Sequence, residues 1–507
     1  MRVLRQIAAV AAFAFFLLIA WGPIAALLAS AAAVPRSEFA GLLIPGARRG
    51  WVLAQTIGYA IAVATLATGA GTAAALYCWR RSDPLATVAR QTALLTAAIP
   101  PYLHALAWLP LSAALPGHGA GEVTGWISAI WVQSLAMLPF CFGLAYFALE
   151  ELDWRGIDAA RVYGSDRRML MRVLLPLLRP ACLASASLAL LLTLADHAVP
   201  SLFSRSTYAM EVFEEFSASH DAPRALLTAI PLVFVSALTL IPLARFWSKA
   251  AQRSSSGGAK PQALQIGGTA SMALRSGAAL AVLPAMALCV ILVREAAHPA
   301  IWAQAIAAGG GDLATSAEVA LLAAALACLP ALVVSRSLSA RPGRLWWLVS
   351  LPLAMPSALA GAGLIWLWNR DLIVPVYGTF WMLVLASLAR FAPLAVLALA
   401  VWRSRLDPVL LEAAAIFGSP SRAFLRVELP LLAPGVAAGA AAVFVLSLAE
   451  LGASLLVAPP GRGTLALRIF NYLHYGASGA VAALAFCLMA TTAIAMLIAA
   501  KLWKAQQ

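Results

Sequence analysis

The sequence predicts an all-α polytopic membrane protein, with about twelve transmembrane helices in two parallel six-helix repeats. Three observations predict this fold class. Apolar residues occupy 63% of the 507 positions and charged residues only 11%, whereas a soluble domain carries about 25% charged residues. Long apolar runs follow one another along the whole chain. One segment of the chain recurs 254 positions later without a gap.

The apolar runs define the predicted spans, because a spanning helix needs about 20 apolar residues. Each run is expected to be helical, since an open sheet in lipid leaves backbone groups without partners. The predicted spans are residues 7–33, 51–79, 92–114, 126–149, 177–202, 225–245, 274–293, 316–335, 345–368, 379–401, 430–457 and 479–500.

The first run follows Arg2 and Arg5 and is about twice as long as the apolar core of a signal peptide. We therefore predict a first spanning helix that is retained. The alternative is removal at the small residues near position 31, which resemble a cleavage site.

Lysine and arginine predict the orientation of the spans. With the N-terminus inside, the inside loops hold far more of these residues than the outside loops, so both termini are predicted to be cytoplasmic. The net charge of +14 comes from these short loops. Because these charges lie in loops between apolar runs, we expect the chain to lie in a lipid bilayer and to bind no nucleic acid.

A polar stretch between the sixth and seventh spans differs from its surroundings. It includes Arg-Ser-Ser-Ser-Gly-Gly-Ala-Lys-Pro at 253–261, a composition typical of a flexible linker. The predicted organisation is a first repeat at 1–247, a cytoplasmic linker at 248–272 and a second repeat at 273–507.

The recurring segment lies at 152–180 and again at 406–434, with 14 of 29 positions identical. Six predicted helices separate the two copies, an even number, so both copies face the same side. The repeat is therefore parallel, with its axis along the membrane normal.

Each copy predicts a short cytoplasmic helix between two turns. Asp153 and Asp407 stand where a helix N-cap belongs. Gly164 and Gly418 supply the left-handed backbone that ends a helix at low cost. Pro420 fits the first position of the helix that follows. A short helix held at both ends suits the docking of a partner protein.

This pattern resembles the cytoplasmic loop of ABC importer permeases, in which Glu-Ala-Ala is followed by Gly and then by a distal Leu-Pro. The second copy matches it fully, and the first copy has Asp in place of Glu. The matching residues are Asp158, Ala159, Ala160, Gly164 and Pro176 in the first copy, and Glu412, Ala413, Ala414, Gly418 and Pro430 in the second.

The resemblance implies a permease subunit in a bacterial inner membrane. In that family the loop is a coupling helix that docks on an ATPase subunit. The implied partners are two copies of the ATPase and an extracytoplasmic substrate-binding protein. The permease itself binds no cofactor, and ATP is hydrolysed by the partner subunit.

Two further segments are similar to the iron(III)-type branch of the family. They are 376–379, Val-Tyr-Gly-Thr, and 383–397, which contains Ala389-Arg390-Phe391-Ala392-Pro393-Leu394. The resemblance favours iron(III) as the substrate. Thiamine, phosphonates and polyamines remain as alternatives.

No residue pattern predicts an enzyme. The chain has no GxxxxGK[ST] loop, so nucleotide is expected to bind elsewhere. The six histidines and six cysteines show no metal-ligand or CxxC spacing. An ion-gradient-driven secondary transporter is the alternative class, but it gives no reason for a repeated docking helix.

Intramembrane charges mark candidates for the translocation path. Asp196 and Glu450 occupy equivalent repeat positions, roughly 30 Å along the helix from Pro176 and Pro430 at 1.5 Å per residue. They are predicted near the outer mouth, as a gate for a cation or as carboxylates bonded to neighbouring backbone. Arg390 is not duplicated in the first repeat. Its alternatives are a pair with Glu450, an anion site or a structural role.

Small residues and prolines predict how the helices meet. Gly435 with Gly439, and Gly361 with Gly363, are expected to allow close helix packing. Pro100, Pro101 and Pro356 break helices at roughly matching places of the two repeats. Broken helices near the middle of a membrane are typical of a transport path.

Overall fold

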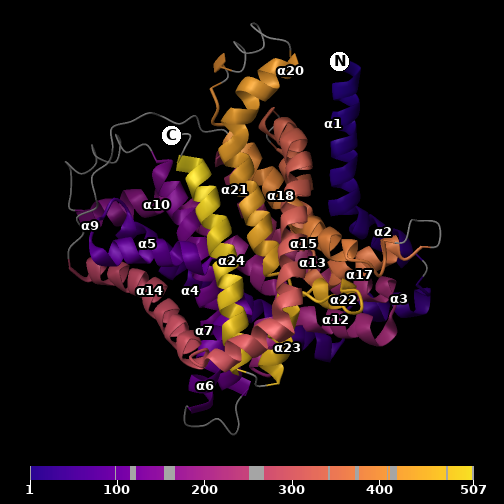
Figure 1. The fold of residues 1–507 in the computed structure, drawn as a ribbon, viewed down its shortest axis with the longest axis horizontal. Coiled ribbons are helices and arrows are strands. Elements are labelled where there is room, and N and C mark those ends of the chain that lie inside the picture. Colours follow the sequence, from indigo (N-terminus) through magenta and orange to yellow (C-terminus); the bar gives the residue numbers. More distant parts are fainter. Residues whose placement is uncertain are drawn as a thin grey trace.

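A computed structural model of the chain contains helices and no strand in the residues that it describes. These residues are 2–32, 34–97, 99–114, 122–152, 166–250, 268–340, 343–370, 376–407, 409–410, 420–475 and 478–504. The predicted all-α polytopic fold is confirmed (Figure 1).

The first half of the chain runs from α1 to α13. Its elements are α1 Arg2–Phe16, the π-helical turn η1 Leu17–Trp21, α2 Gly22–Ala31, α3 Arg36–Leu43, α4 Ala47–Cys78, α5 Pro84–Thr96, α6 Pro101–Ala114, α7 Glu122–Glu150, α9 Asp166–Met169, the π-helical turn η2 Leu170–Leu174, α10 Leu175–Leu194, α11 Ala198–Leu202, α12 Tyr208–Ser219 and α13 Ala222–Ala250.

The second half runs from α14 to α24. Its elements are α14 Gly268–Glu295, α15 Pro299–Ala340, α16 Arg344–Ser350, the 3₁₀ turn η3 Leu351–Ala354, α17 Ser357–Trp368, α18 Trp381–Arg403, α20 Pro420–Ala423, the π-helical turn η4 Phe424–Glu428, α21 Leu429–Leu448, α22 Ser454–Val457, α23 Leu465–His474 and α24 Ser478–Lys504.

The repeat read from one segment extends through the structure. The elements α9, η2 and α10 begin and end at positions that differ by 254 from those of α20, η4 and α21. The helix pairs α4 with α7 and α15 with α18 form equivalent contacts, and α10 and α21 each pack between the members of their pair. Helix α13 packs on α10, and α24 packs on α21 and also on α15.

The first helix of each half packs against the other half. Helix α14 lies along α4 and α5, while α1 and η1 contact α15 and α18. The predicted linker at 248–272 overlaps both neighbouring helices, since α13 continues to Ala250 and α14 begins at Gly268. Residues 251–267 lie outside the described residues.

The count of twelve spans needs correction. Ten helices of the described residues are long and apolar enough to cross a bilayer, and α16 with η3 and α17 makes an eleventh if this bent pair is one span. The two parts of that pair meet at 98°. The break is at Pro356, where the missing N–H and the fixed φ end the preceding turn.

The predicted span at 92–114 is two shorter helices. Helix α5 has 13 residues and α6 has 14, and each is shorter than the roughly 20 residues that a bilayer requires. Pro101 occupies the first position of α6, where a proline is favoured, and Pro100 disfavours helix in the residue before it. The helix breaks expected at Pro100, Pro101 and Pro356 are thus confirmed.

Two other predicted spans end earlier than expected. Helices α10 and α21 stop at Leu194 and Leu448, and the short helices α11 and α22 follow after a break. The apolar runs 177–202 and 430–457 continue across these breaks, so hydropathy alone did not reveal them. In both halves the break places a carboxylate beside free backbone N–H groups.

Small residues allow close helix contacts, as predicted. A Cβ atom at Gly435 would lie 2.6 Å from Trp402 Cγ, and one at Gly439 would lie 3.3 Å from Ala395 Cα. At Gly363 the added atom would meet Pro23 of α2 at 2.9 Å. Packing therefore depends on the absence of a side chain at these positions.

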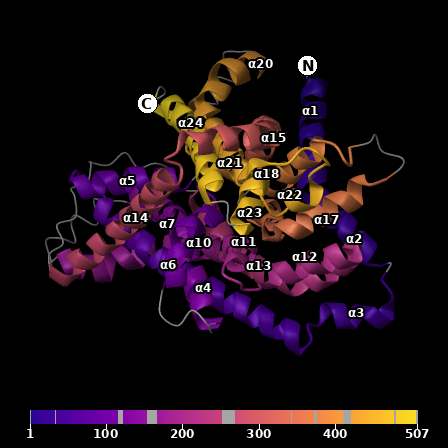
Figure 2. The same ribbon diagram turned by 60° about the horizontal axis from the view of Figure 1, so that its bottom comes forward.

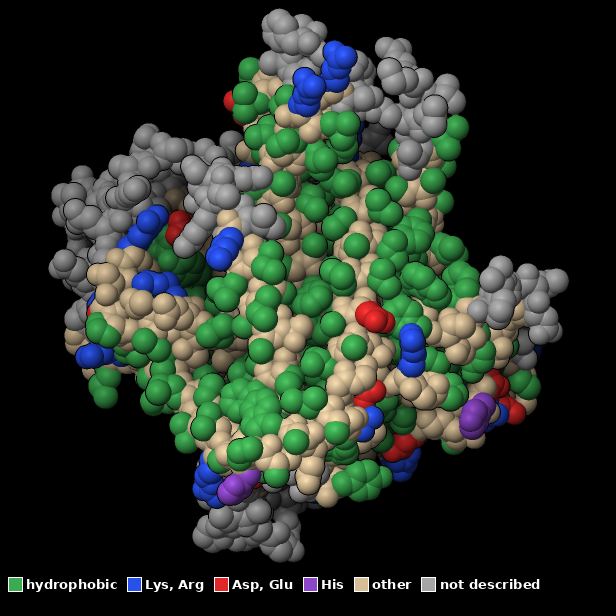
Figure 3. All heavy atoms as spheres, in the orientation of Figure 1, with side chains coloured by type: hydrophobic (Ala, Val, Ile, Leu, Met, Phe, Trp, Pro, Cys, Tyr) green, Lys and Arg blue, Asp and Glu red, His purple; other side chains and the backbone are tan. Residues whose placement is uncertain are grey.

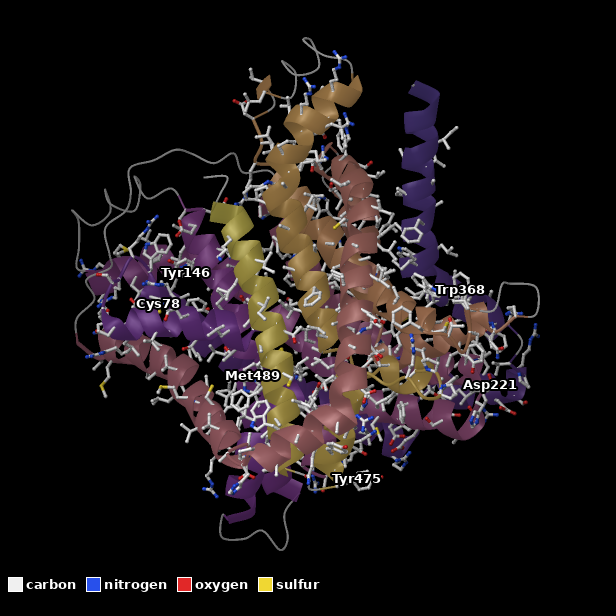
Figure 4. All side chains as sticks on the ribbon, viewed as in Figure 1. Cys78, Tyr146, Asp221, Trp368, Tyr475 and Met489 are labelled. Atoms are coloured by element: carbon white, nitrogen blue, oxygen red, sulfur yellow. The ribbon has the colours of Figure 1, made fainter. Side chains whose placement is uncertain are left out.

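The surface and the helix ends agree with a membrane protein. Figure 3 shows apolar side chains over most of the central part of one face, with charged side chains chiefly toward its edges. In Figure 4, Cys78 at the end of α4 lies on the opposite side of the molecule from Asp221, which precedes α13.

Candidate functional site

A cavity of about 140 Å³ lies between the two halves of the chain. It is bordered by the ends of α10 and α21, the breaks before α6 and α17, and the middle of α7 and α18. The lining residues are Ala97, Ile99, Pro100, Pro101, Tyr102, Gln133, Met137, Phe140, Leu192, Ala195, Asp196, His197, Ala198, Ser357, Arg390, Phe391, Val445, Leu446, Ala449, Glu450, Leu451 and Gly452.

The cavity joins equivalent elements of both repeats. Helices α10 and α21 meet at it with their C-terminal ends, whereas their other ends, next to α9 and α20, lie on separate parts of the molecule (Figures 1 and 2). Both helix breaks expected at a transport path lie at its wall, through Pro100, Pro101 and Ser357. All three candidate path residues, Asp196, Glu450 and Arg390, line it together.

The two carboxylates bond neighbouring backbone. Asp196 Oδ1 accepts from the Ala198 N–H at 3.1 Å and Oδ2 from the Val199 N–H at 3.4 Å, at the start of α11. Glu450 Oε1 accepts from the Ala453 N–H at 2.8 Å, before α22. The carboxylates thus take up amides that the first turn of each short helix leaves free. Of the two predicted roles, the structure thus has the carboxylates bonded to neighbouring backbone. Both carboxylates still lie at the cavity wall.

Arg390 forms an ion pair with Glu450, through Nη1 and Oε2. The pair lies within the second half and joins α18 to the turn after α21. The Glu450 side chain is 2% exposed and that of Arg390 is 19% exposed, so the guanidinium keeps access to the cavity. Because Arg390 has no counterpart in the first repeat, Asp196 lacks an equivalent partner on α7.

Several polar side chains of the cavity were missed at the sequence level. Both side-chain atoms of Gln133 lack a hydrogen-bond partner among the described residues, as do Tyr102 Oη and His197 Nε2. Gln133 is fully buried, and Tyr102 and His197 are nearly so. A glutamine inside the apolar run 126–149 was the available signal, since polar groups in a span are costly.

Gly452 controls how closely the turn before α22 approaches α17 at the cavity. An added Cβ would lie 2.0 Å from Ser357 Oγ and 3.4 Å from the His197 ring. Any side chain here would separate the turn before α22 from α17. The closeness of the walls therefore depends on this glycine.

Most of the predicted docking residues lie outside the described residues. This applies to Asp158, Ala159, Ala160 and Gly164, and to Glu412, Ala413, Ala414 and Gly418. Pro176 and Pro430 are described, at the second position of α10 and α21. At the edge of the second segment, the Asp407 carboxylate accepts from the Val409 N–H at 2.9 Å, as a helix cap does.

Ion pairs tie the short helices α12 and α23 to the long helices beside them. On α12, Glu211 accepts two hydrogen bonds from Arg48 of α4, at 2.8 and 2.6 Å. On α23 the charges are exchanged, since Arg468 bonds Asp312 of α15. Burial opposes the Arg468 charge, but the hydrogen bonds to Asp312 and Tyr472 outweigh it and raise the pKa of Arg468.

The described residues contain no group of three or more His, Cys, Asp or Glu side chains placed to hold a metal ion. The six cysteines are free, and Cys78 and Cys141 are buried among the helices.

Comparison with known proteins gives one kind of relative. No family model matches the chain. Over 148 residues it is 30% identical to proteins named "Putative 2-aminoethylphosphonate transport system permease protein PhnV" from Salmonella typhimurium and Salmonella choleraesuis. The match covers 29% of this chain and 56% of each relative. The chain thus spans little more than half the length of the curated relatives it matches.

Proposed function

We propose that this chain, a homologue of transport-system permeases, is the transmembrane subunit of an ATP-driven importer of the ABC class. The homology to a transport permease carries the proposal. The two-fold arrangement of ten or eleven spans around a shared cavity supports it, because a path between two repeats is typical of transporters. The chain forms the path and catalyses no reaction of its own.

In this proposal two ATPase subunits dock on the segments 152–180 and 406–434 and hydrolyse the ATP. A substrate-binding protein delivers the solute from the other side. The chain lies in a bacterial inner membrane with both termini in the cytoplasm. The N-terminal α1, α20 and the C-terminal end of α24 lie along the upper edge of Figure 1, which suits this orientation.

Motion of the two halves would couple ATP hydrolysis to transport. Closure of the ATPase pair draws the α9 and α20 ends together, and the cavity at the opposite ends of α10 and α21 opens or closes in response. Such a motion changes the positions of Asp196 and Glu450, which follow α10 and α21 directly, and of Arg390, which is paired with Glu450.

Two substrates compete within the proposal. The sequence resemblance favours iron(III), whereas the relatives are named for 2-aminoethylphosphonate. Thiamine and polyamines are the remaining alternatives. The cavity holds a guanidinium beside two carboxylates, and this mixed charge suits a small organic ion with both signs better than a metal cation.

The test is uptake by proteoliposomes that contain this chain, its ATPase and its binding protein. Labelled iron(III), thiamine, 2-aminoethylphosphonate and a polyamine are offered separately, with ATP or with a proton or sodium gradient. We expect one of the solutes to accumulate, and its accumulation should require ATP on the side of the membrane where the ATPase subunits lie. Uptake driven by an ion gradient without ATP would refute the ABC proposal and favour a secondary transporter.

Variants of the docking segments separate coupling from path formation. Gly164→Val and Gly418→Val each place a β-branched residue where a positive φ is expected, which such residues resist. The double variant should lose its ATPase subunits during purification, while Gly143→Val, in a helix with open space around it, should keep them. A double variant that retains its ATPase and transports normally contradicts the docking assignment.

A further inference from the structure

The cavity between the halves has more buried polar atoms than the protein itself satisfies. Gln133 Nε2 and Oε1, Tyr102 Oη and His197 Nε2 have no hydrogen-bond partner among the described residues, and all three side chains line the cavity. Buried polar groups in proteins are almost always bonded. Something polar therefore has to enter the cavity and bond them, either water or a ligand.

The charges of the cavity are of both signs. Arg390 contacts Glu450 through Nη1, and a guanidinium carries five N–H donors, so other donors remain for a second partner. Asp196 comes from the other half, where position 136, the equivalent of Arg390, is an alanine. An anionic group beside Arg390 and a cationic group beside Asp196 and Glu450 would both be neutralised.

The volume indicates the size of ligand that the cavity holds as it stands. A cavity of about 150 Å³ binds benzene, which has six heavy atoms, and this cavity measures about 140 Å³. A molecule with roughly six to eight non-hydrogen atoms fits on that scale. Thiamine and long polyamines are too large for it as it stands.

We propose that this cavity is a binding site, inside the permease itself, for a small zwitterion with one acid group and one ammonium group. Arg390 binds the acid group, and the carboxylates of Asp196 and Glu450 bind the ammonium. Gln133 Nε2 and Tyr102 Oη donate hydrogen bonds to the acid oxygens, and Gln133 Oε1 accepts one from the ammonium. The proposal rests on the proposed transport function and names the ligand class of its path.

The site explains why Arg390 stands on one repeat only. A symmetric pair of arginines at the equivalent positions on α7 and α18 would favour a dianion, whereas position 136 is an alanine. One guanidinium with two carboxylates is a set of charges that recognises both ends of a zwitterion. The ion pair between Arg390 and Glu450 then exchanges for contacts with the ligand.

The test is equilibrium binding of labelled 2-aminoethylphosphonate to the purified complex of this chain with its ATPase, in nanodiscs and without the binding protein. Four unlabelled competitors separate the chemistry of the site. They are 2-aminoethylphosphonate, 3-aminopropanoate, ethylphosphonate without the ammonium, and ethylamine without the acid. We expect both zwitterions to compete and both single-charge compounds to compete at least about tenfold less well, since each lacks a charged hydrogen bond.

Variants locate the binding. Arg390→Gln should weaken binding at least about tenfold, and Gln133→Leu about threefold to tenfold, because one removes a charge-assisted and the other a neutral hydrogen bond. The matched control is Arg462→Gln, an exposed arginine on the loop before α23, which should bind like the wild type. The competitor series uses only wild-type protein, so it decides the matter even if a variant fails to fold.

The outcomes separate this site from the transport function. A complex that hydrolyses ATP and imports a solute, yet binds no zwitterion at millimolar concentration, overturns the site and leaves the transporter. Equal competition by ethylphosphonate overturns the zwitterion class, and unchanged binding in both cavity variants overturns the location. A chain that binds no ATPase at all overturns the proposed function instead.

Discussion

Glu151 and Arg405 should hold the two halves together at the base of the docking segments. The two residues differ by 254 positions, so they are equivalents in the repeat. Arg405 Nη2 lies 2.9 Å from Glu151 Oε1, and its guanidinium also lies 4.7 Å from the centre of the Phe147 ring, which belongs to the first half. A residue that pairs with its own equivalent lies on or near the two-fold axis.

The size of the effect follows from the geometry. At 2.9 Å the Coulomb attraction is about 6 kcal/mol at an effective dielectric constant near 20. Desolvation offsets most of it, because the side chains are 22% and 15% exposed. The Nη2 atom is not aligned as a hydrogen bond, which removes a directional contribution. We expect a net coupling of about 1–2 kcal/mol, near the upper end of the couplings measured in membrane proteins.

A double-mutant cycle measures this coupling. Glu151→Gln, Arg405→Gln and the double variant are unfolded in mixed detergent micelles, and the free energies of unfolding are compared. The charge-reversed variant, Glu151→Arg with Arg405→Glu, should recover about half or more of the loss, since it restores the attraction but not the Phe147 contact. A coupling below about 0.3 kcal/mol, or no recovery on reversal, would refute the pairing across the axis.

Three further predictions test the packing, the path and the short helices. Gly71→Ala should destabilise the chain by about 1–3 kcal/mol, because the added Cβ would lie 2.8 Å from the backbone nitrogen of Phe142 in α7. The control Gly69→Ala, with nothing within 4 Å, should be neutral or stabilising by up to about 1 kcal/mol, and equal unfolding midpoints would contradict the close contact. Asp196→Asn combined with Glu450→Gln should reduce ATP-driven uptake of the labelled solute at least tenfold. Unchanged uptake would show that the two carboxylates only cap the short helices that follow them. Asp312→Asn should lower the free energy of unfolding by about 1–3 kcal/mol by leaving Arg468 without its anion, and chemical unfolding that matches the wild type would show that α23 does not depend on this pair.

The two-fold repetition of the helices follows from the sequence because one offset relates the two copies of the repeated segment. The segment at 152–180 and its copy predicted a helix that begins at Pro420 in the second copy, and the elements from α9 to α10 and from α20 to α21 keep the offset of 254 at their ends. Hydropathy marked most spans because apolar runs must be buried in lipid. The breaks at Pro100 and Pro356 were predictable because proline lacks an N–H.

The rest depends on contacts that no local pattern contains. The π-helical turns η2 and η4 occupy equivalent positions, but the helix propensities of their residues do not distinguish them from ordinary α-helix. The breaks after Leu194 and Leu448 depend on carboxylates that accept hydrogen bonds from backbone amides, and the mean hydropathy of these runs does not reveal the breaks. Arg390 had three open roles, and only the approach of α18 to the turn after α21 pairs it with Glu450.

The subunit composition of the assembled transporter tests the central claim most directly. If this chain alone supplies both halves of the path, the intact complex in detergent has a mass that corresponds to one copy of it with two ATPase subunits. The measurement is native mass spectrometry of the complex purified through a tag on this chain. One permease chain per two ATPases is the predicted result, and two permease chains per two ATPases would contradict it.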